Sequence, residues 1–282
     1  MNKTCLVLEG GAMRGIYSAG VIDAFLDKNI EVDAIIGVSA GALFGINYVS
    51  KQRGRVLRYN LDNAKNKNYM GFYSLFTTGD IMNKKFCFDT LVHETDPFDF
   101  DTYKKSKIKF YATVTNIITG KPEYPEIKDL KKDMEYLRAS GSMPLLSRNV
   151  VIGDNIYLDG GMSDSIPVKY AQDLGYKNVI VVTTQPANYE KKPYKILPFK
   201  LKYHKYKNFI KTIEKRHLMY NNTLKYIKSE EDKNNIFVIR PTRKVNIKKL
   251  EHDKEVIKEQ YNLGYNDAIN KMNDLNKYLN RG

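Results

Sequence analysis

The first fifty residues alternate between short apolar runs and helix-like spacing. Residues 4–8 form an apolar run that ends at two glycines, and apolar positions then recur at helical spacing between Val21 and Lys28. A second apolar run covers residues 34–38, and residues 42–46 begin another helical pattern. This strand-helix-strand-helix order predicts a parallel sheet covered by helices.

The rest of the chain adds elements of the same two kinds. We expect strands at residues 107–117, 177–184 and 236–239, and helices at residues 130–139, 166–174 and 254–279. Residues 60–101 are aromatic without a clear period, and we expect them to form an irregular excursion over the sheet.

The composition changes after Pro186. Residues 191–216 hold ten Lys or Arg and one Glu, interleaved with aromatic residues. This pattern predicts a basic linker that runs into a helix. We therefore expect an α/β domain over residues 1–186 and a basic, mainly helical region over residues 187–282.

Composition and charge narrow the class of protein. With 42% hydrophobic and 28% charged residues over 282 positions, the chain can bury a core and is not disordered. No apolar run approaches the ~20 residues of a bilayer span, and the first residues lack the features of a secretion signal, so a cytoplasmic location is expected. The net charge of +14 is enough to favour an anionic partner such as nucleic acid or a phospholipid surface, but we prefer the simpler explanation of a solvated basic surface. No nucleic-acid-binding motif is present.

The sharpest motif is Gly37-Val38-Ser39-Ala40-Gly41, a G-x-S-x-G between a predicted strand and a predicted helix. A sharp strand-to-helix turn lifts the serine oxygen off the sheet, and the flanking glycines, Gly37 and Gly41, allow the backbone to pass close by. Free N–H groups at the start of the helix, Ala40 among them, face negative charge that develops at this point. This context favours Ser39 as a nucleophile over an ordinary helix-capping serine.

A glycine-rich loop, Gly10-Gly11-Ala12-Met13-Arg14-Gly15, follows the first predicted strand. Adjacent parallel strands place this loop beside Ser39 at the carboxyl edge of the sheet. The N–H groups of Gly11 and Ala12 are then candidates for an oxyanion hole, with Arg14 adding positive potential or locking the loop. A nucleotide-binding loop is the alternative, but neither G-x-G-x-x-G nor a G-K-S/T sequence is present.

A nucleophilic serine also needs a base. None of the four histidines, at positions 93, 204, 217 and 252, lies in a glycine-rich or strand-end context. Asp159 ends a short predicted strand and is followed by Gly160 and Gly161. A lone D-G-G is usually a turn, so Asp159 gains weight as a base only as the partner of the other two motifs.

These three motifs, in this order, resemble the patatin-like phospholipase family. The segment Leu137–Pro144, with Arg138-Ala139-Ser140, is similar to a further family motif, and the likeness extends from about Leu6 to Pro186. The Lys-rich C-terminal extension resembles that of a bacterial subgroup.

The resemblance implies a three-layer α/β/α fold with a mostly parallel central sheet, and a Ser39–Asp159 dyad with the oxyanion hole in the glycine-rich loop. Ala12 stands where the family usually has a third glycine, and the loop is expected to be intact if that position does not need a positive φ.

The expected activity is hydrolysis of a lipid or other acyl ester without metal or organic cofactor. Contact with an anionic membrane surface is a further expectation, and no specific nucleic acid is expected to bind. Two other functions stay open at this point: a lipid-binding module with a weak or inactive site, and a nucleotide-binding α/β protein.

Overall fold

A single eight-stranded sheet organises the computed structural model, which describes residues 2–281. The strand order is β5-β6-β3-β2-β1-β7-β8, with the short β4 paired to β3. Strands β3, β2, β1, β7 and β8 run parallel, whereas β4, β5 and β6 are joined by antiparallel pairs. The predicted mostly parallel central sheet is therefore confirmed.

The strands are β1 (Thr4–Leu8), β2 (Ala34–Val38), β3 (Lys109–Asn116), β4 (Pro122–Glu123), β5 (Val150–Ile152), β6 (Asn155–Asp159), β7 (Asn178–Val182) and β8 (Phe237–Ile239). The α-helices are α1 (Ile16–Asp27), α2 (Ala40–Val49), α3 (Arg55–Asp62), α4 (Phe72–Thr78), α5 (Phe100–Lys105), α6 (Leu130–Gly141), α7 (Val168–Asp173), α8 (Leu197–Lys202), α9 (Lys207–Asp232), α10 (Lys254–Asn270) and α11 (Met272–Leu279). Two 3-10 turns, η1 (Ala12–Gly15) and η3 (Gly160–Met162), and one π-helix, η2 (Phe86–Thr95), complete the described elements.

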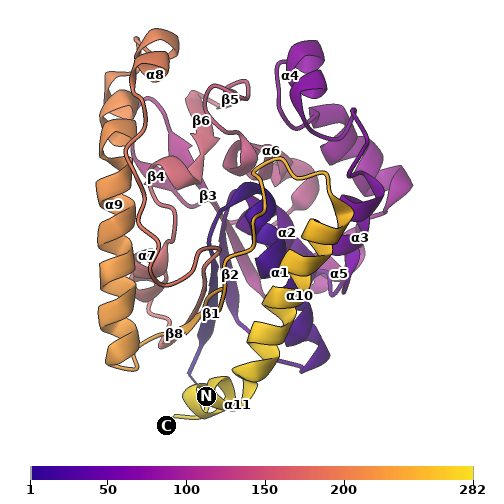
Figure 1. Ribbon diagram of the computed structural model, residues 1–282, viewed down its shortest axis with the longest axis vertical. Coiled ribbons are helices and arrows are strands. Elements are labelled where there is room, and N and C mark those ends of the chain that lie inside the picture. Colours follow the sequence, from indigo (N-terminus) through magenta and orange to yellow (C-terminus); the bar gives the residue numbers. More distant parts are fainter. Residues whose placement is uncertain (1, 282) are drawn as a thin grey trace.

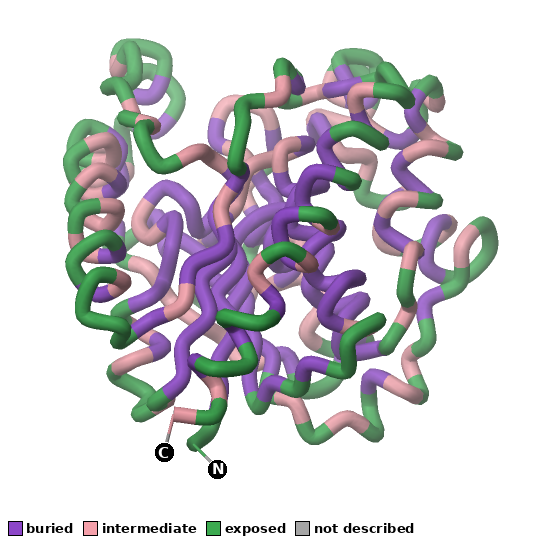
Figure 2. The backbone as a smooth tube through the Cα atoms, turned by 60° about the horizontal axis from the view of Figure 1, so that its bottom comes forward, coloured by how far each residue is buried: buried purple, intermediate pink, exposed green. Residues whose placement is uncertain are grey.

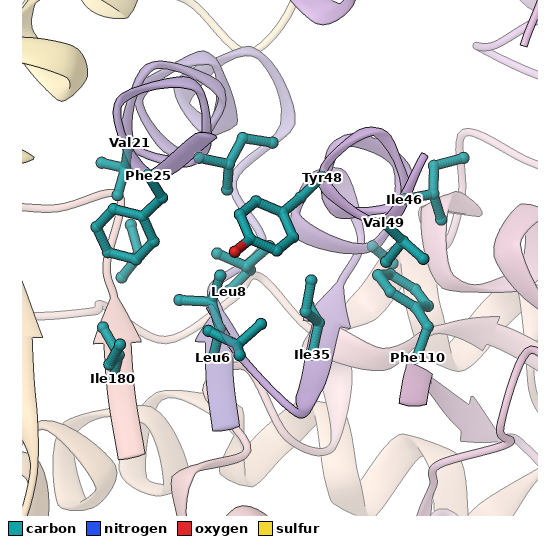
Figure 3. Packing of buried hydrophobic residues seen from close by; sticks show 14 of the residues in the cluster. Leu6, Leu8, Val21, Phe25, Ile35, Ile46, Tyr48, Val49, Phe110 and Ile180 are labelled. Carbon is teal, nitrogen blue, oxygen red and sulfur yellow. The ribbon is translucent and has the colours of Figure 1, made fainter. Parts of the chain in front are cut away.

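Helices cover both faces of the sheet, as Figure 1 shows, with α7 and α9 on one side and α1, α2 and α10 on the other. Alternate residues of each strand point to opposite faces. Leu6 and Leu8 thus pack beneath α1 and α2, where Phe25 and Tyr48 cover them (Figure 3). Cys5 and Val7 belong to the opposite core, together with side chains of α7 and α9. Because both faces are covered, the central strands are buried along their length, as Figure 2 shows.

The C-terminal region is built into the same body. Strand β8 pairs with β7 at one end of the sheet, and α10 lies along α1. The two helices approach closely because Gly20 and Gly264 lack side chains: a Cβ on either would lie 2.1 or 2.0 Å from a carbonyl oxygen of the other helix. The predicted division after residue 186 therefore separates elements that share one sheet.

Two details of the sequence prediction were wrong. The single helix expected over residues 254–279 is two helices, because the chain turns at Lys271 and directs Leu275 and Tyr278 into the core. The Tyr278 hydroxyl accepts a hydrogen bond from the backbone N–H of Val179. The segment 60–101 is also more ordered than expected, since it contains α4, η2 and the start of α5.

No helix among the described residues is long and apolar enough to cross a membrane.

Candidate active site

Ser39 occupies the turn between β2 and α2. Its backbone has φ +53° and ψ −121°, a conformation that is costly for a residue with a side chain and that is found at sharp strand-to-helix turns. The N–H of Ser39 donates to Ser140 Oγ at 2.9 Å, and the Ser140 hydroxyl donates to the Thr113 carbonyl oxygen. The strained turn is thus held by α6 and β3.

The backbone passes this turn with little space. Gly41 lies against the end of β1, where a Cβ would be 2.4 Å from the Leu8 carbonyl oxygen. Gly37 is the last residue but one of β2 and pairs with Leu8 of β1. The glycine-rich loop leaves β1 at this same point, as the parallel pairing predicts, so Gly10 lies directly beside Ser39.

Asp159 is the hydrogen-bond partner of Ser39. The Ser39 hydroxyl donates to Asp159 Oδ2 at 2.8 Å, and the Gly161 N–H donates to Oδ1 at 2.8 Å. Asp159 reaches this position because β6 runs antiparallel to β3 and ends beside the carboxyl ends of the parallel strands. Gly160 and Gly161 form the turn η3 that follows. Residues 120 positions apart in sequence therefore meet.

Both side chains are buried, with exposed fractions of 8% for Ser39 and 4% for Asp159. Burial raises the pKa of the Asp159 carboxyl, because the charged form loses hydration. The hydrogen bonds from Ser39 and Gly161 oppose this rise, and so does the positive charge of Arg216. A carboxyl with a raised pKa is a stronger proton acceptor than an exposed aspartate.

The glycine-rich loop presents free backbone donors. Within residues 2–281, the N–H groups of Gly11, Ala12 and Ala40 have no hydrogen-bond acceptor. Gly15 brings η1 against α2, since a Cβ on Gly15 would lie 2.7 Å from the Ala40 Cβ. The Arg14 N–H donates to the Gly11 carbonyl oxygen at 3.2 Å and closes the turn.

Ala12 has a positive φ of +50°. The sequence analysis expected an intact loop only if this position did not need a positive φ, and that condition is not met. The alanine nevertheless adopts the left-handed region, at a cost of about 1 kcal/mol relative to a glycine. One methyl group therefore adds strain to the loop without removing its N–H.

The histidines lie elsewhere. His93 stacks on Phe100, His204 is exposed near Leu201, and His252 contacts the Ala64 carbonyl oxygen. Among residues 2–281, none of the four histidines is hydrogen bonded to Ser39 or Asp159. Among the described residues, no group of three or more His, Cys, Asp or Glu side chains is arranged to hold a metal ion.

Two hollows meet at Ser39. The first is apolar and runs between α2, η2 and α6, with Leu43, Phe44 and Leu137 among its lining residues. The second is lined by more charged side chains and is called the polar hollow below. It has a volume of about 850 Å³ and is bounded by the glycine-rich loop, the Asp159 turn and residues of the C-terminal region. Ala12, Ser39, Met143 and Lys249 line both hollows.

Sequence reasoning missed several residues around this pair. Ser140 lies in the Arg138-Ala139-Ser140 segment that was noted without a role, and the structure places its hydroxyl on the Ser39 backbone. Lys191 and Arg216 belong to the segment expected to be a linker, yet both line the polar hollow. No pattern in the sequence distinguishes them from the other cations of that segment.

Fold and site together define a three-layer α/β/α protein that pairs a serine hydroxyl with a buried carboxylate at the carboxyl edge of its sheet. The chain belongs to the patatin-like phospholipase family, whose model matches residues 6–171. A second model, for a domain of unknown function (DUF6363), matches residues 206–280.

Several known proteins are similar to the chain. It is 27% identical over 273 residues to the uncharacterized protein YjjU of Escherichia coli, and the aligned region covers 93% of this chain and 75% of YjjU. It is 31% identical over 187 residues to lysophospholipase nte1 of Aspergillus fumigatus, covering 63% of this chain but only 12% of that much longer protein. Among solved structures, VipD of Legionella pneumophila is similar with a TM-score of 0.46 and 12% identity, over 97% of this chain and 67% of that one.

Proposed function

We propose that this protein is a serine acyl hydrolase of lipids, with Ser39 as nucleophile and Asp159 as the only catalytic base. The 2.8 Å hydrogen bond from the Ser39 hydroxyl to Asp159, made from a strained strand-to-helix turn, is the observation that carries this proposal. Membership of the patatin-like phospholipase family supports it, as does the likeness to lysophospholipases.

In the proposed reaction, Asp159 accepts the Ser39 proton while Ser39 Oγ forms a bond to the acyl carbonyl carbon. The carbonyl oxygen becomes negatively charged and accepts hydrogen bonds from the free N–H groups of Gly11, Ala12 and Ala40. As the ester bond breaks, the leaving alcohol takes the proton from Asp159.

Water then attacks the acyl-enzyme. Asp159 accepts a proton from the water, and the tetrahedral intermediate collapses to the free fatty acid. Ser39 recovers its proton from Asp159, and the cycle consumes one water for each ester bond. No step requires a metal or an organic cofactor.

The apolar hollow is the proposed site of the acyl chain, because its lining is almost entirely hydrophobic and opens at Ser39. The exposed apolar residues suggest how the enzyme reaches lipid. Phe72 and Phe76 of α4 and Leu197 and Leu201 of α8 are all more than 60% exposed. Both helices lie beyond the carboxyl edge of the sheet, at the top of Figure 1.

We therefore propose that α4 and α8 contact a membrane surface around the active site through these exposed apolar side chains. Such peripheral contact is compatible with the cytoplasmic location that the sequence predicts, which stays a prediction.

The direct test is release of fatty acid from a panel of phospholipids, lysophospholipids, monoacylglycerols and short p-nitrophenyl esters, with Ser39→Ala as the blank. We expect turnover by the wild type and none by Ser39→Ala. Liposome binding without turnover of any ester contradicts the hydrolase and favours a lipid-binding module.

A further inference from the structure

Cationic side chains gather in the polar hollow beside Ser39. Six of them line it, namely Arg14, Lys191, Lys192, Lys195, Arg216 and Lys249, against three carboxylates, Glu9, Asp159 and Glu190. Arg14 belongs to the glycine-rich loop, whereas Lys191, Arg216 and Lys249 come from the C-terminal region.

Three anchors hold the cations from the C-terminal region. The Lys191 backbone exchanges two hydrogen bonds with the Asn221 side chain of α9, at 2.9 and 3.0 Å. Arg216 Nε donates to the carbonyl oxygen of Gly161, next to Asp159. The Lys249 carbonyl oxygen accepts from the Met13 N–H of the glycine-rich loop at 3.4 Å. The Arg216 contact holds the guanidinium itself beside the Asp159 turn, whereas the other two contacts hold the backbone from which the Lys191 and Lys249 side chains extend.

No carboxylate among residues 2–281 lies within 4.0 Å of the charged nitrogens of Arg14, Lys191, Arg216 or Lys249. Glu9 is already engaged, since it accepts hydrogen bonds from the Tyr220 hydroxyl and the Thr184 N–H. The Lys191 ammonium lies instead over the Tyr220 ring, 4.2 Å from its centre.

Burial and neighbouring positive charges both act on these cations. Burial, and then the nearby charge of Arg216, lower the pKa of Lys191 to about 7. The pKa of Lys249 is also lowered, by partial desolvation at the pocket wall and then by the charges of Arg14 and Arg216. Cations without counter-ions in a hollow are stabilised by an anion that binds among them.

We propose that this hollow is a binding subsite for a phosphate group carried by the alcohol part of the ester, with Lys191, Arg216 and Lys249 as its main ligands. This inference rests on the proposed hydrolase function. The apolar and cationic hollows diverge from Ser39, so an acyl chain in the first places the leaving alcohol in the second. Guanidinium and ammonium groups bind phosphate oxygens through charge-assisted hydrogen bonds.

Two matched esters test the subsite: 1-octanoylglycerol 3-phosphate and 1-octanoylglycerol, which share the acyl chain and differ only in the phosphate. We expect wild type to have at least a tenfold higher kcat/KM for the phosphorylated ester. In Lys191→Gln/Lys249→Gln this ratio should fall at least tenfold. Lys215→Gln is the matched control, because Lys215 is an exposed cation next to Arg216 that lines neither hollow. A ratio in the double variant equal to that of Lys215→Gln overturns the subsite.

A binding measurement separates this inference from the proposed function. Calorimetric titration of Ser39→Ala with octyl phosphate and with inorganic phosphate needs no turnover. We expect octyl phosphate to bind at least tenfold more tightly than inorganic phosphate, and Lys191→Gln to weaken it tenfold. If that binding is seen but no ester is hydrolysed, the subsite stands and the hydrolase proposal fails. Hydrolysis of both esters without Lys191-dependent binding overturns the subsite alone.

Discussion

Replacement of Asp159 by asparagine separates the proposed catalytic role of this residue from its role in the fold. Asparagine has the same shape and keeps an oxygen that accepts from the Gly161 N–H, which lies 2.8 Å from Asp159 Oδ1. Its amide nitrogen then takes the place of Oδ2, 2.8 Å from Ser39 Oγ. That nitrogen is a donor and cannot accept the serine proton.

The expected loss of rate is large because, among residues 2–281, Asp159 is the one carboxylate or imidazole hydrogen bonded to the Ser39 hydroxyl. General-base catalysis contributes about 10²- to 10⁴-fold. Since the amide also donates to the serine oxygen, we expect kcat to fall by about 10³- to 10⁴-fold, equivalent to roughly 4 to 5.5 kcal/mol in the activation barrier.

Stability should change in the opposite direction. Burial raises the pKa of Asp159, so the folded state loses stability as pH rises from the ordinary carboxyl pKa to the raised pKa. The loss is complete above the raised pKa and absent below the ordinary one. Asp159→Asn should therefore have a thermal midpoint equal to or above that of the wild type near neutral pH, with the difference vanishing in acid.

Stopped-time assays of fatty-acid release and calorimetric melting at pH 4 and pH 7.5 measure both effects. A variant that keeps more than a tenth of the wild-type kcat would refute the assignment of Asp159 as the base. A variant that melts well below wild type at neutral pH would refute the reasoning about its buried charge.

Three further outcomes follow from the geometry. Ala12→Gly should retain activity and melt at the same or a slightly higher temperature. The glycine relieves about 1 kcal/mol of backbone strain, which offsets the roughly 0.4–1 kcal/mol lost because glycine gives the unfolded chain more conformational entropy. A drop of several degrees in the thermal midpoint would contradict a strained, positive φ at position 12. With rising pH, kcat/KM should increase as Asp159 loses its proton, at a pH above the ordinary carboxyl range. Arg216→Gln should move this increase to higher pH, because the Arg216 charge lowers the pKa of Asp159. A shift of the increase to lower pH would contradict this reasoning. Phe76→Ser should weaken sedimentation with anionic vesicles severalfold. Leu218→Ser is the control, because it removes an exposed apolar side chain from α9, and it should leave sedimentation unchanged. Equal effects of the two variants would exclude α4 as the membrane contact.

The parallel core of the fold could be predicted from the sequence because its strands are short, apolar and separated by clear helices. The pairing of β1 with β2 follows from that order, and with it the position of the glycine-rich loop beside Ser39. The antiparallel β6 could not be placed in this way, since nothing local to Asp159 shows that β6 pairs with β3. Asp159 was predicted as the base only because three motifs together resemble a family.

The C-terminal region shows where sequence reasoning stopped. Lysines of the segment 191–216 look alike in sequence, yet Lys191 lines the polar hollow while Lys215 is exposed. The difference arises from tertiary contacts, such as the two hydrogen bonds between Lys191 and Asn221. The conformation of Ala12 is likewise a product of packing around the loop, because an alanine alone does not favour a positive φ.

The central claim is that Ser39 is the nucleophile of an acyl hydrolase. Reaction with a fluorophosphonate, followed by peptide mass spectrometry, tests it most directly. We predict one covalent adduct on the peptide that contains Ser39, none in Ser39→Ala, and much slower labelling in Asp159→Asn. Unlabelled wild type, or an adduct that persists in Ser39→Ala, would contradict the claim.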